Sequence, residues 1–298
     1  MGLFLNTLVA IAYTTVVLGS IFAASSVSLS LIYGTMRFLN LAHGSFLVIG
    51  GYVAWVFAHY LGLPLYLAIV FATGFGFALG LFTYFIMLKP LLGIGSPKWD
   101  IATIIASVGL AIFLEAAILE IFGPRLKALP HAIEGSVIIG TTVIRYNALF
   151  IGAVAIAMLV ITNWYLTNSR NGIALRAVAS DVDAAYLMGI PSGKIFASAV
   201  AISGALATSA GALLGSFYLL KPDRGLDPMM TAIVVVVFGG LGSIKGTIIA
   251  AYIVGFIQAF VALTIGIKWS LPVLFAFMIV VLIFRPYGLY GESQQKRM

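Results

Sequence analysis

Few residues in this chain of 298 amino acids have types and spacings suited to acid–base or metal chemistry. The histidines are His43, His59 and His131, and none stands four residues from another, the helical spacing of a zinc-binding pair. The absence of cysteine excludes disulfides and thiolate metal sites. No Ser/His/Asp group or pair of carboxylates has a catalytic spacing. The sequence therefore predicts no metal, no cofactor and no enzyme active site.

Two glycine-containing stretches come closest to a nucleotide site, and neither fits. A phosphate-binding loop needs the pattern G-x-x-x-x-G-K-[ST]. The nearest candidate, Gly193-Lys194, lacks the upstream glycine and the following hydroxyl residue. Gly239-Gly240-Leu241-Gly242 resembles half of a dinucleotide loop, but no strand–helix unit or acidic partner surrounds it. The chain therefore does not bind ATP through a loop of this kind.

Ionisable residues are rare inside the long apolar stretches. Glu115 stands in the middle of Ile101–Phe122 and Glu120 near its end. Carriers coupled to protons or sodium usually bury ionisable groups in their membrane spans, so one central carboxylate is thin support for ion coupling. Glu115 could contact the ammonium group of a substrate. It could equally form a hydrogen bond within the helix bundle or with a partner subunit.

The composition places most of the chain in a membrane. Hydrophobic residues make up 62% and charged residues 8%, whereas soluble domains carry about 25% charged residues. A soluble protein with so few charges could not cover its surface. The net charge of +7 suits basic cytoplasmic loops. Binding of nucleic acid would need a soluble domain with a basic face and aromatic residues that stack on the bases. The sequence has no such domain, so we expect no nucleic acid partner.

We expect an all-α integral membrane protein of one domain, residues 1–298, with eight or nine transmembrane segments, some broken by glycine. A spanning helix needs about 20 mostly apolar residues. Two candidate segments, Phe46–Ala58 with thirteen residues and Thr231–Phe238 with eight, are short for a complete crossing, and one of them could be re-entrant. The candidate segments are Leu3–Ile32, Phe46–Ala58, Leu65–Leu88, Ile101–Phe122, Ala148–Leu166, Ile195–Leu220, Thr231–Phe238, Thr247–Ile267 and Leu271–Phe284.

The Lys and Arg residues orient these segments. With nine crossings and a cytoplasmic C-terminus, the inside pieces hold ten of the 16 basic residues and the outside pieces six. The positive-inside rule favours this orientation, which puts the N-terminus outside. The outside loop 123–147 contains proline and glycine and predicts an irregular or short β-like cap. Loop 167–194 is the sizeable cytoplasmic loop, and its middle is expected to be helical.

Two glycine-interrupted segments, Tyr33–Gly51 and Phe238–Gly246, give a faint two-fold repeat. Paired broken helices in two halves indicate a transport site at an inverted-repeat interface. Alternatively, glycines mark close helix packing, Asn40 and His43 cap freed backbone groups, and the second segment is a tight cytoplasmic turn. On the first interpretation the candidate translocation path comprises Asn40, His43, Gly44, Ser45, Glu115, Gly239, Gly240, Gly242 and Ser243.

Three motifs, in order along nearly the whole chain, resemble the branched-chain amino acid permease family. Ser45 departs from the pattern, since many family members carry an acidic residue there, which puts any role of that carboxylate in doubt. The motifs are Arg37-Phe38-Leu39-Asn40-Leu41-Ala42-His43-Gly44-Ser45 with Ile49-Gly50-Gly51-Tyr52, then Phe238-Gly239-Gly240-Leu241-Gly242-Ser243-Ile244-Lys245-Gly246-Thr247, then Arg285-Pro286-Tyr287-Gly288-Leu289-Tyr290-Gly291.

The resemblance implies a permease subunit of an ATP-driven importer in the bacterial cytoplasmic (inner) membrane. Its solute would be a branched-chain amino acid, or a similar small molecule such as urea, a short amide or an aromatic acid. The implied partners, besides membrane lipid, are a second homologous permease, two ATP-binding cassette subunits and an extracytoplasmic solute-binding protein. The alternative is an ion-coupled secondary transporter or channel that acts without an ATPase.

The cytoplasmic loop 167–194 resembles the segment that couples such permeases to their ATPase. Asp183-Ala184-Ala185-Tyr186-Leu187-Met188-Gly189 matches the E-A-A-x-x-x-G core, with Asp in place of Glu. The resemblance implies a short helix in a groove of the ATPase subunit; otherwise the segment is an ordinary solvated loop. A turn at Gly189-Ile190-Pro191 would end the helix. Small residues would form the docking face and charged residues its rim: Ala184, Ala185 and Gly189, with Arg176, Asp181, Asp183 and Lys194.

Overall fold

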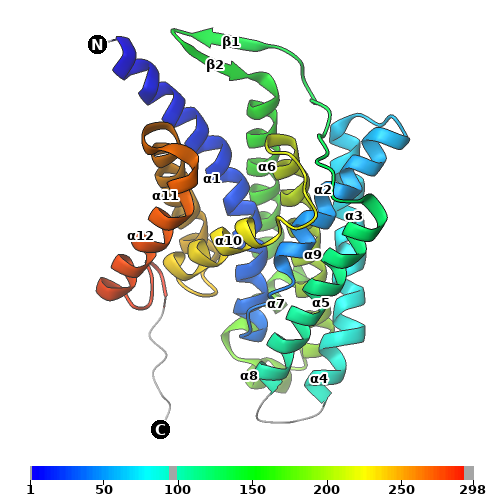
Figure 1. Ribbon diagram of the computed structural model, residues 1–298. Helices are drawn as coiled ribbons and strands as arrows, with labels where there is room; N and C mark the ends of the chain where they lie inside the picture. The colour runs from blue at the N-terminus through cyan, green and yellow to red at the C-terminus, as the bar shows by residue number, and fades with distance from the viewer. Residues whose placement is uncertain (1, 94–98, 292–298) are drawn as a thin grey trace.

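The computed structural model describes residues 2–93 and 99–291, most of which lie in helices (Figure 1). Two short antiparallel strands, β1 (Ser136–Ile139) and β2 (Thr142–Arg145), pair Ser136 with Arg145 and form a hairpin. The helices are α1 (Gly2–Met36), α2 (His43–Tyr60), α3 (Leu65–Thr83), α4 (Lys89–Gly93), α5 (Trp99–Phe122), α6 (Tyr146–Asn168), α7 (Arg170–Ser180), α8 (Val182–Leu187), α9 (Ser192–Phe217), α10 (Leu226–Gly239), α11 (Ile244–Val261) and α12 (Ser270–Phe284).

Six helical stretches of the described chain are long and apolar enough to cross a membrane. The prediction of an all-α membrane protein is thereby confirmed, whereas helix length alone does not yield eight or nine crossings. The six apolar helical stretches are Asn6–Met36, Leu65–Leu92, Ile101–Phe122, Tyr146–Asn168, Ser192–Phe217 and Ile244–Phe284. The predicted short segments correspond to α2, of 18 residues, and α10, of 14 residues.

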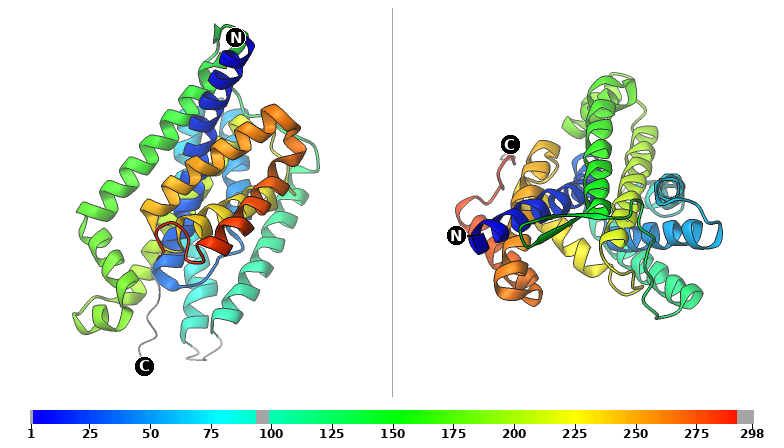
Figure 2. Two further views of the ribbon diagram at one scale, coloured as in Figure 1. Left: turned by 90° about the vertical axis from the view of Figure 1, so that its left-hand side faces the viewer. Right: turned by 90° about the horizontal axis from the view of Figure 1, so that it is seen from above.

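The first and the last long apolar stretches differ in continuity. The first candidate segment, Leu3–Ile32, lies within one continuous helix of 35 residues, α1. The last two candidate segments, Thr247–Ile267 and Leu271–Phe284, correspond to α11 and α12, which are separated by a π-helical turn at Ala262–Gly266, where Gly266 adopts a φ of 120°. The chain reverses there, so α11 and α12 run back side by side (Figure 2). Glycine supplies this left-handed conformation without the steric cost that a side chain would add.

The series α1–α2–α3–α5 and α9–α10–α11–α12 form an inverted repeat. The long helices α1 and α9 run in opposite directions, and each is followed by a non-helical link, residues 37–42 or 218–225. The shorter helices α2 and α10 then run from the interior toward opposite ends of the bundle (Figure 1). Both α3 and α11 continue into a π-helical turn. The packing corresponds as well, since α3 packs along α9 as α11 packs along α1.

This arrangement corrects the predicted partner of the first broken segment. The counterpart of link 37–42 is link 218–225, whereas Phe238–Gly246 corresponds to the short connection between α2 and α3. The reason is that glycine clusters here mark close helix contacts and tight turns. A Cβ on Gly255 of α11 would lie 2.8 Å from the Cα of Gly19 in α1. Such contacts let membrane helices approach closely without a hydrophobic driving force.

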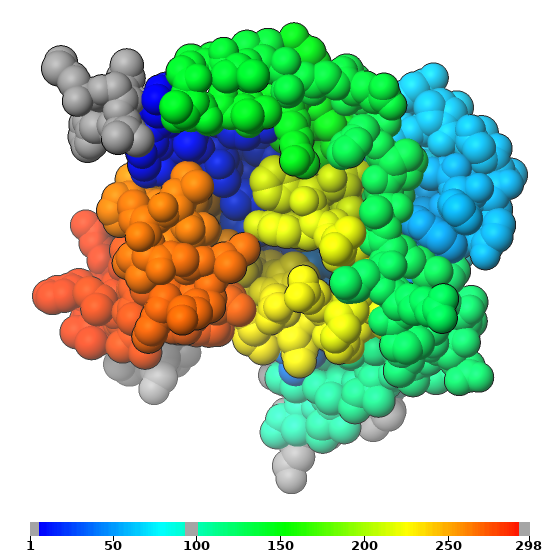
Figure 3. Space-filling view, turned by 45° about the horizontal axis from the view of Figure 1, so that its top comes forward, coloured from blue at the N-terminus to red at the C-terminus, as the bar shows by residue number. Residues whose placement is uncertain are grey.

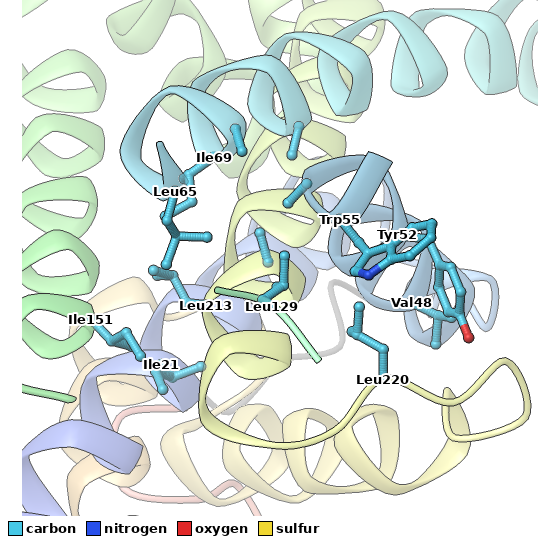
Figure 4. Packing of buried hydrophobic residues seen from close by; sticks show 14 of the residues in the cluster. Ile21, Val48, Tyr52, Trp55, Leu65, Ile69, Leu129, Ile151, Leu213 and Leu220 are labelled. Atoms are coloured by element: carbon cyan, nitrogen blue, oxygen red, sulfur yellow. The ribbon is translucent and has the colours of Figure 1, made fainter. Parts of the chain in front are cut away.

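The largest cluster of buried hydrophobic residues joins α1, α2, α3, α5, α6 and α9 (Figure 4). Ile21, Leu65 and Leu213 are among its fully buried members. Leu129 and Leu220 extend the cluster into the segments that follow α5 and α9. Because six helices share one packed interior, the positions of the two links and of α2 are set by the whole bundle.

The bundle has two distinct ends (Figure 1). The hairpin end carries the start of α1, the β-hairpin and the C-terminal ends of α2, α5 and α9; the α8 end carries α7, α8 and the C-terminal end of α12. At the hairpin end, the Thr142 hydroxyl donates a hydrogen bond to the Asn6 carbonyl, 3.0 Å away. The short β-like cap predicted for residues 123–147 is therefore present, and it is attached to α1.

Candidate translocation and coupling sites

The link 37–42 carries the chain from the α8 end back into the bundle. Arg37 adopts a φ of 58°, the one positive value at a non-glycine residue in the described chain. Its guanidinium donates a hydrogen bond to the Ala179 carbonyl at the end of α7. His43, the first residue of α2, contacts Ser25 of α1. The part of α1 from Ser25 to Met36 is about 16 Å long, so α2 begins near the middle of a hydrocarbon layer about 30 Å thick.

The polar side chains of this link satisfy its backbone. The Ala42 amide donates to Asn40 Oδ1 at 3.1 Å, and the Leu41 amide donates to Ser107 Oγ of α5 at 3.1 Å. Unsatisfied backbone groups are costly inside a membrane. Asn40 and His43 are only 3% and 1% exposed. Their positions therefore fit the interpretation as groups that close a helix break, and neither lines an open path in this conformation.

His43 also fastens the break to α1. Ser25 Oγ lies 3.2 Å from Nε2 of the His43 ring, and Ser28 Oγ lies 3.5 Å from Nδ1. Both serines are buried. The two contacts join the first turn of α2 to the middle of α1.

The N-terminal ends of α2 and α10 meet at Gly44 and Gly225. A Cβ on Gly44 would touch the Gly225 carbonyl and lie 3.0 Å from Met229 Cβ of α10, while a Cβ on Gly225 would lie 2.6 Å from Glu115 Oε1. Ser45 Oγ is 3.4 Å from the same carboxylate oxygen. Glu115 thus stands beside the positive ends of two helix dipoles, which attract acidic side chains. Glu115 therefore accepts a hydrogen bond within the helix bundle, which is one of the alternatives that the sequence left open.

The second group of candidate path residues lies apart from this junction. Gly239 ends α10, and Gly240 and Gly242 adopt positive φ values of 101° and 85° in a tight turn. Ser243 caps the next helix, since its Oγ accepts a hydrogen bond from the Gly246 amide at the start of α11. The C-terminal segment covers this turn, because the Leu289 and Tyr290 amides donate to the carbonyls of residues 238 and 239. The structure therefore places these four residues at the α8 end.

The coupling motif folds as a short helix with both ends closed. Asp181 caps the N-terminal end of α8, and its Oδ1 accepts hydrogen bonds of 3.0 Å from the amides of Asp183 and Ala184. At the other end Gly189 adopts a φ of 83°. The Ile190 amide donates to the carbonyl of residue 185 and the Gly189 amide to that of residue 186. These two bonds form a Schellman cap.

The exposed surface of α8 differs in composition from the small-residue face expected. Ala185 is buried in a cluster with Leu31 of α1 and Ile195 of α9, and Ile190 packs against the same cluster. Ala184, Asp183 and Gly189 are exposed. The Arg176 guanidinium donates to the Thr167 carbonyl and so attaches α7 to α6.

Three large apolar side chains dominate this surface, and they were missed in the sequence. Tyr186, Leu187 and Met188 are 69%, 84% and 83% exposed. Exposed apolar patches outside the membrane mark interaction sites. The signal available in the sequence was the run of three consecutive large apolar residues in loop 167–194. We call Tyr186, Leu187 and Met188 the α8 knob.

Comparisons with known proteins agree over nearly the whole chain. Residues 11–282 match the model of a family described as branched-chain amino acid transport system / permease component. The chain is 30% identical to the high-affinity branched-chain amino acid transport system permease protein BraD of Pseudomonas aeruginosa, with 94% of each chain covered. It is also 30% identical to LivH of Escherichia coli, which bears the same description, with 96% of each covered. The fructose import permease protein FrcC of Rhizobium meliloti is 32% identical over 48% of this chain and 38% of its own.

Proposed function

Because the chain belongs to the family of branched-chain amino acid transport system permease components, we propose that it is the membrane-spanning permease subunit of an ATP-driven importer for these amino acids. The observation that carries this proposal is the α8 knob, which presents three exposed apolar side chains outside the membrane helices. An ion-coupled carrier acting alone needs no such docking surface. Full-length similarity to BraD and LivH supports leucine, isoleucine and valine as the solutes.

The α8 knob docks on an ATP-binding cassette subunit. Burying apolar surface is worth about 25 cal/mol per Å², and the three side chains point away from the bundle while Ala185 faces into it. The complete transporter then contains a second homologous permease, two ATP-binding cassette subunits and an extracytoplasmic solute-binding protein.

The buried side of α8 connects the docking surface to both repeats. Ala185 and Ile190 belong to a cluster that includes Leu31 of α1 and Ile195 of α9, with Ile244 of α11 packed against it. A displacement of α8 therefore acts directly on the long helices of both halves. Packed interiors are stiff and transmit such displacements, so ATP binding on the partner displaces α1 and α9 through this cluster.

The membrane topology follows from the location of α8. With α7 and α8 in the cytoplasm of a bacterial inner membrane, the hairpin end faces outside, in agreement with the positive-inside rule. Links 37–42 and 218–225, continued by α2 and α10, each complete one crossing. The chain then crosses nine times, with its N-terminus outside and its C-terminus inside.

Transport by the reconstituted complex tests the proposal. This chain is placed in liposomes with its second permease and ATPase subunits, and solute-binding protein is added outside. We expect leucine-loaded binding protein to stimulate ATP hydrolysis and leucine uptake. Stimulation only by urea, a short amide or an aromatic acid would overturn the solute assignment. Leucine flux through this chain alone, without ATPase subunits, would overturn the importer mechanism.

A pair of matched variants tests the docking surface within the same system. Leu187→Ser removes an apolar side chain from the α8 knob, whereas Ile138→Ser removes one that is 68% exposed on the β-hairpin at the opposite end. We expect L187S to weaken ATPase association and uptake and I138S to leave both at the wild-type level. Equal binding of ATPase subunits to L187S and wild type would refute the assigned docking surface.

A further inference from the structure

A cavity of about 480 Å³ opens at the hairpin end, between the two repeats. Its walls come from α1, α2, α9, link 218–225, α10 and the turn that joins α11 to α12. Figure 3 shows the hollow from the hairpin end, bordered by the segments coloured blue, yellow and orange. Small-molecule sites in proteins have volumes of about 300–1,000 Å³, so the cavity suits a solute of amino-acid size.

The inner part of the cavity combines apolar walls with one polar pair. Phe22 and Leu47 come from the first repeat and Leu214 from the second. Between them, Gln258 of α11 donates a hydrogen bond from its amide nitrogen to Thr231 Oγ1 of α10, at 3.4 Å. The interior therefore offers an aliphatic surface together with an amide and a hydroxyl group.

Charges of both signs stand at the rim. Arg224, Asp227 and Lys268 line the cavity and are exposed, and the start of α10 contributes its helix N-terminus. Lys221 also lines the cavity, but it forms an ion pair with Asp223. Two cations and one carboxylate at the rim are thus available to a ligand that itself carries both charges.

A buried hydroxyl in the same lining has no partner. Ser270, the first residue of α12, is 8% exposed, and its Oγ makes no hydrogen bond within the described chain. A buried polar group without a partner destabilises the state that contains it. Ser270 lines the cavity, so a bound polar ligand is a means of satisfying it.

We infer that this cavity, enclosed within one permease chain, binds the transported amino acid on its extracytoplasmic side. The inference rests on the proposed function. The carboxylate of the amino acid meets Arg224, Lys268 and the N-terminal end of α10, and its ammonium group meets Asp227. The aliphatic side chain packs against Phe22, Leu47 and Leu214.

A second hollow of similar size provides the contrast. It measures about 490 Å³ and lies between α3, α6 and α9. Its lining carries no charged residue, and two of its hydroxyls, those of Thr73 and Ser209, bond to each other. Ile202 of α9 lines this second hollow, while Leu214 on the same helix lines the cavity. Both side chains are half-buried, which makes them a matched pair.

The absence of cysteine from the chain permits a direct test. Leu214→Cys and Leu271→Cys place single thiols on opposite walls of the cavity, and Ile202→Cys is the control. Each variant is assembled with the partner subunits in vesicles and treated from outside with a charged methanethiosulfonate. We expect L214C and L271C to react and I202C not to react. Saturating leucine with its binding protein should slow the two reactions by about tenfold.

A functional variant complements the labelling. Gln258→Leu removes one hydrogen bond from the interior and should raise the KM for leucine uptake about tenfold. The rate of leucine uptake at saturating leucine should fall by less than the KM rises, a split between KM and kcat that a misfolded chain would not produce.

The outcomes separate the two proposals. If the wild-type complex imports leucine but L214C and L271C fail to react, or react at the same rate with and without leucine, the cavity inference is overturned and the proposed function stands. If the wild-type complex imports none of the branched-chain amino acids, both fall.

Discussion

The C-terminal cap of α8 supports a quantitative prediction about docking. Gly189 adopts a φ of 83°, and a Cβ added there would meet no atom within 4 Å. The left-handed conformation costs an L-residue about 1–2 kcal/mol. Because the surrounding space is open, Gly189→Ala and Gly189→Leu carry the same backbone cost in the permease alone. That cost lowers the population of the capped helix about 5- to 30-fold.

The assembled transporter distinguishes the two variants. If an ATPase subunit covers Gly189, the leucine side chain adds a clash that alanine does not make. We therefore expect the apparent Kd for ATPase subunits, titrated onto permease in vesicles, to rise by about 5- to 30-fold in G189A. It should rise further in G189L, with leucine uptake falling in parallel. Gly189→Asn should be the mildest change, since asparagine tolerates left-handed backbone.

Gly62 provides the control for these variants. It lies at the hairpin end with a φ of 64°, and a Cβ added there would likewise meet no atom within 4 Å. Gly62→Ala and Gly62→Leu carry the same backbone cost on the face opposite the ATPase and should leave the Kd unchanged. Equal Kd values for G189A and G189L would show that the ATPase leaves Gly189 uncovered. Wild-type Kd values for both would refute the role of the cap.

Three further outcomes are expected. Asn40→Leu removes the acceptor of the Ala42 amide, so it should destabilise the permease by about 1–3 kcal/mol. The loss should appear as a lower Tm of the permease in detergent. An unchanged Tm with reduced uptake would instead favour a role of Asn40 in lining the translocation path. Gly76→Leu forces α3 away from α9, where a Cβ would meet the Gly204 carbonyl, and should also cost about 1–3 kcal/mol; Gly74→Leu on the same helix, with open space around it, should unfold at the wild-type temperature. Glu115→Gln keeps an acceptor for its hydrogen bond, so ATP-driven uptake should fall by no more than about fivefold, whereas complete loss would favour ion coupling.

The helices were predictable from the sequence because long apolar runs have few alternatives in a membrane. The cap of α8 was predictable for a local reason as well, since Gly189 followed by Ile190-Pro191 is a strong stop signal. The mid-membrane breaks were harder to place. Link 37–42 depends on a hydrogen bond from Leu41 to Ser107, residues far apart in the sequence. Link 218–225 contains Pro222 and several charges, and resembles an ordinary loop.

The site residues show the same division between local and distant determinants. The inward position of Ala185 depends on the cluster formed by α1, α6, α7 and α9. Within a six-residue helix, no periodicity can indicate which face is buried. The junction of Gly44, Gly225 and Glu115 joins three helices distant in sequence, so its geometry required the fold.

The inverted repeat explains why α6 stands between its two halves. In the proposed topology each repeat crosses the membrane four times, and an even number of crossings returns the chain to its starting face. Two such units joined directly would point the same way. One additional crossing changes the parity, and α6 supplies it. The same extra helix delivers α7 and α8 to the cytoplasm, so the connection that inverts the second half is also the one that meets the ATPase.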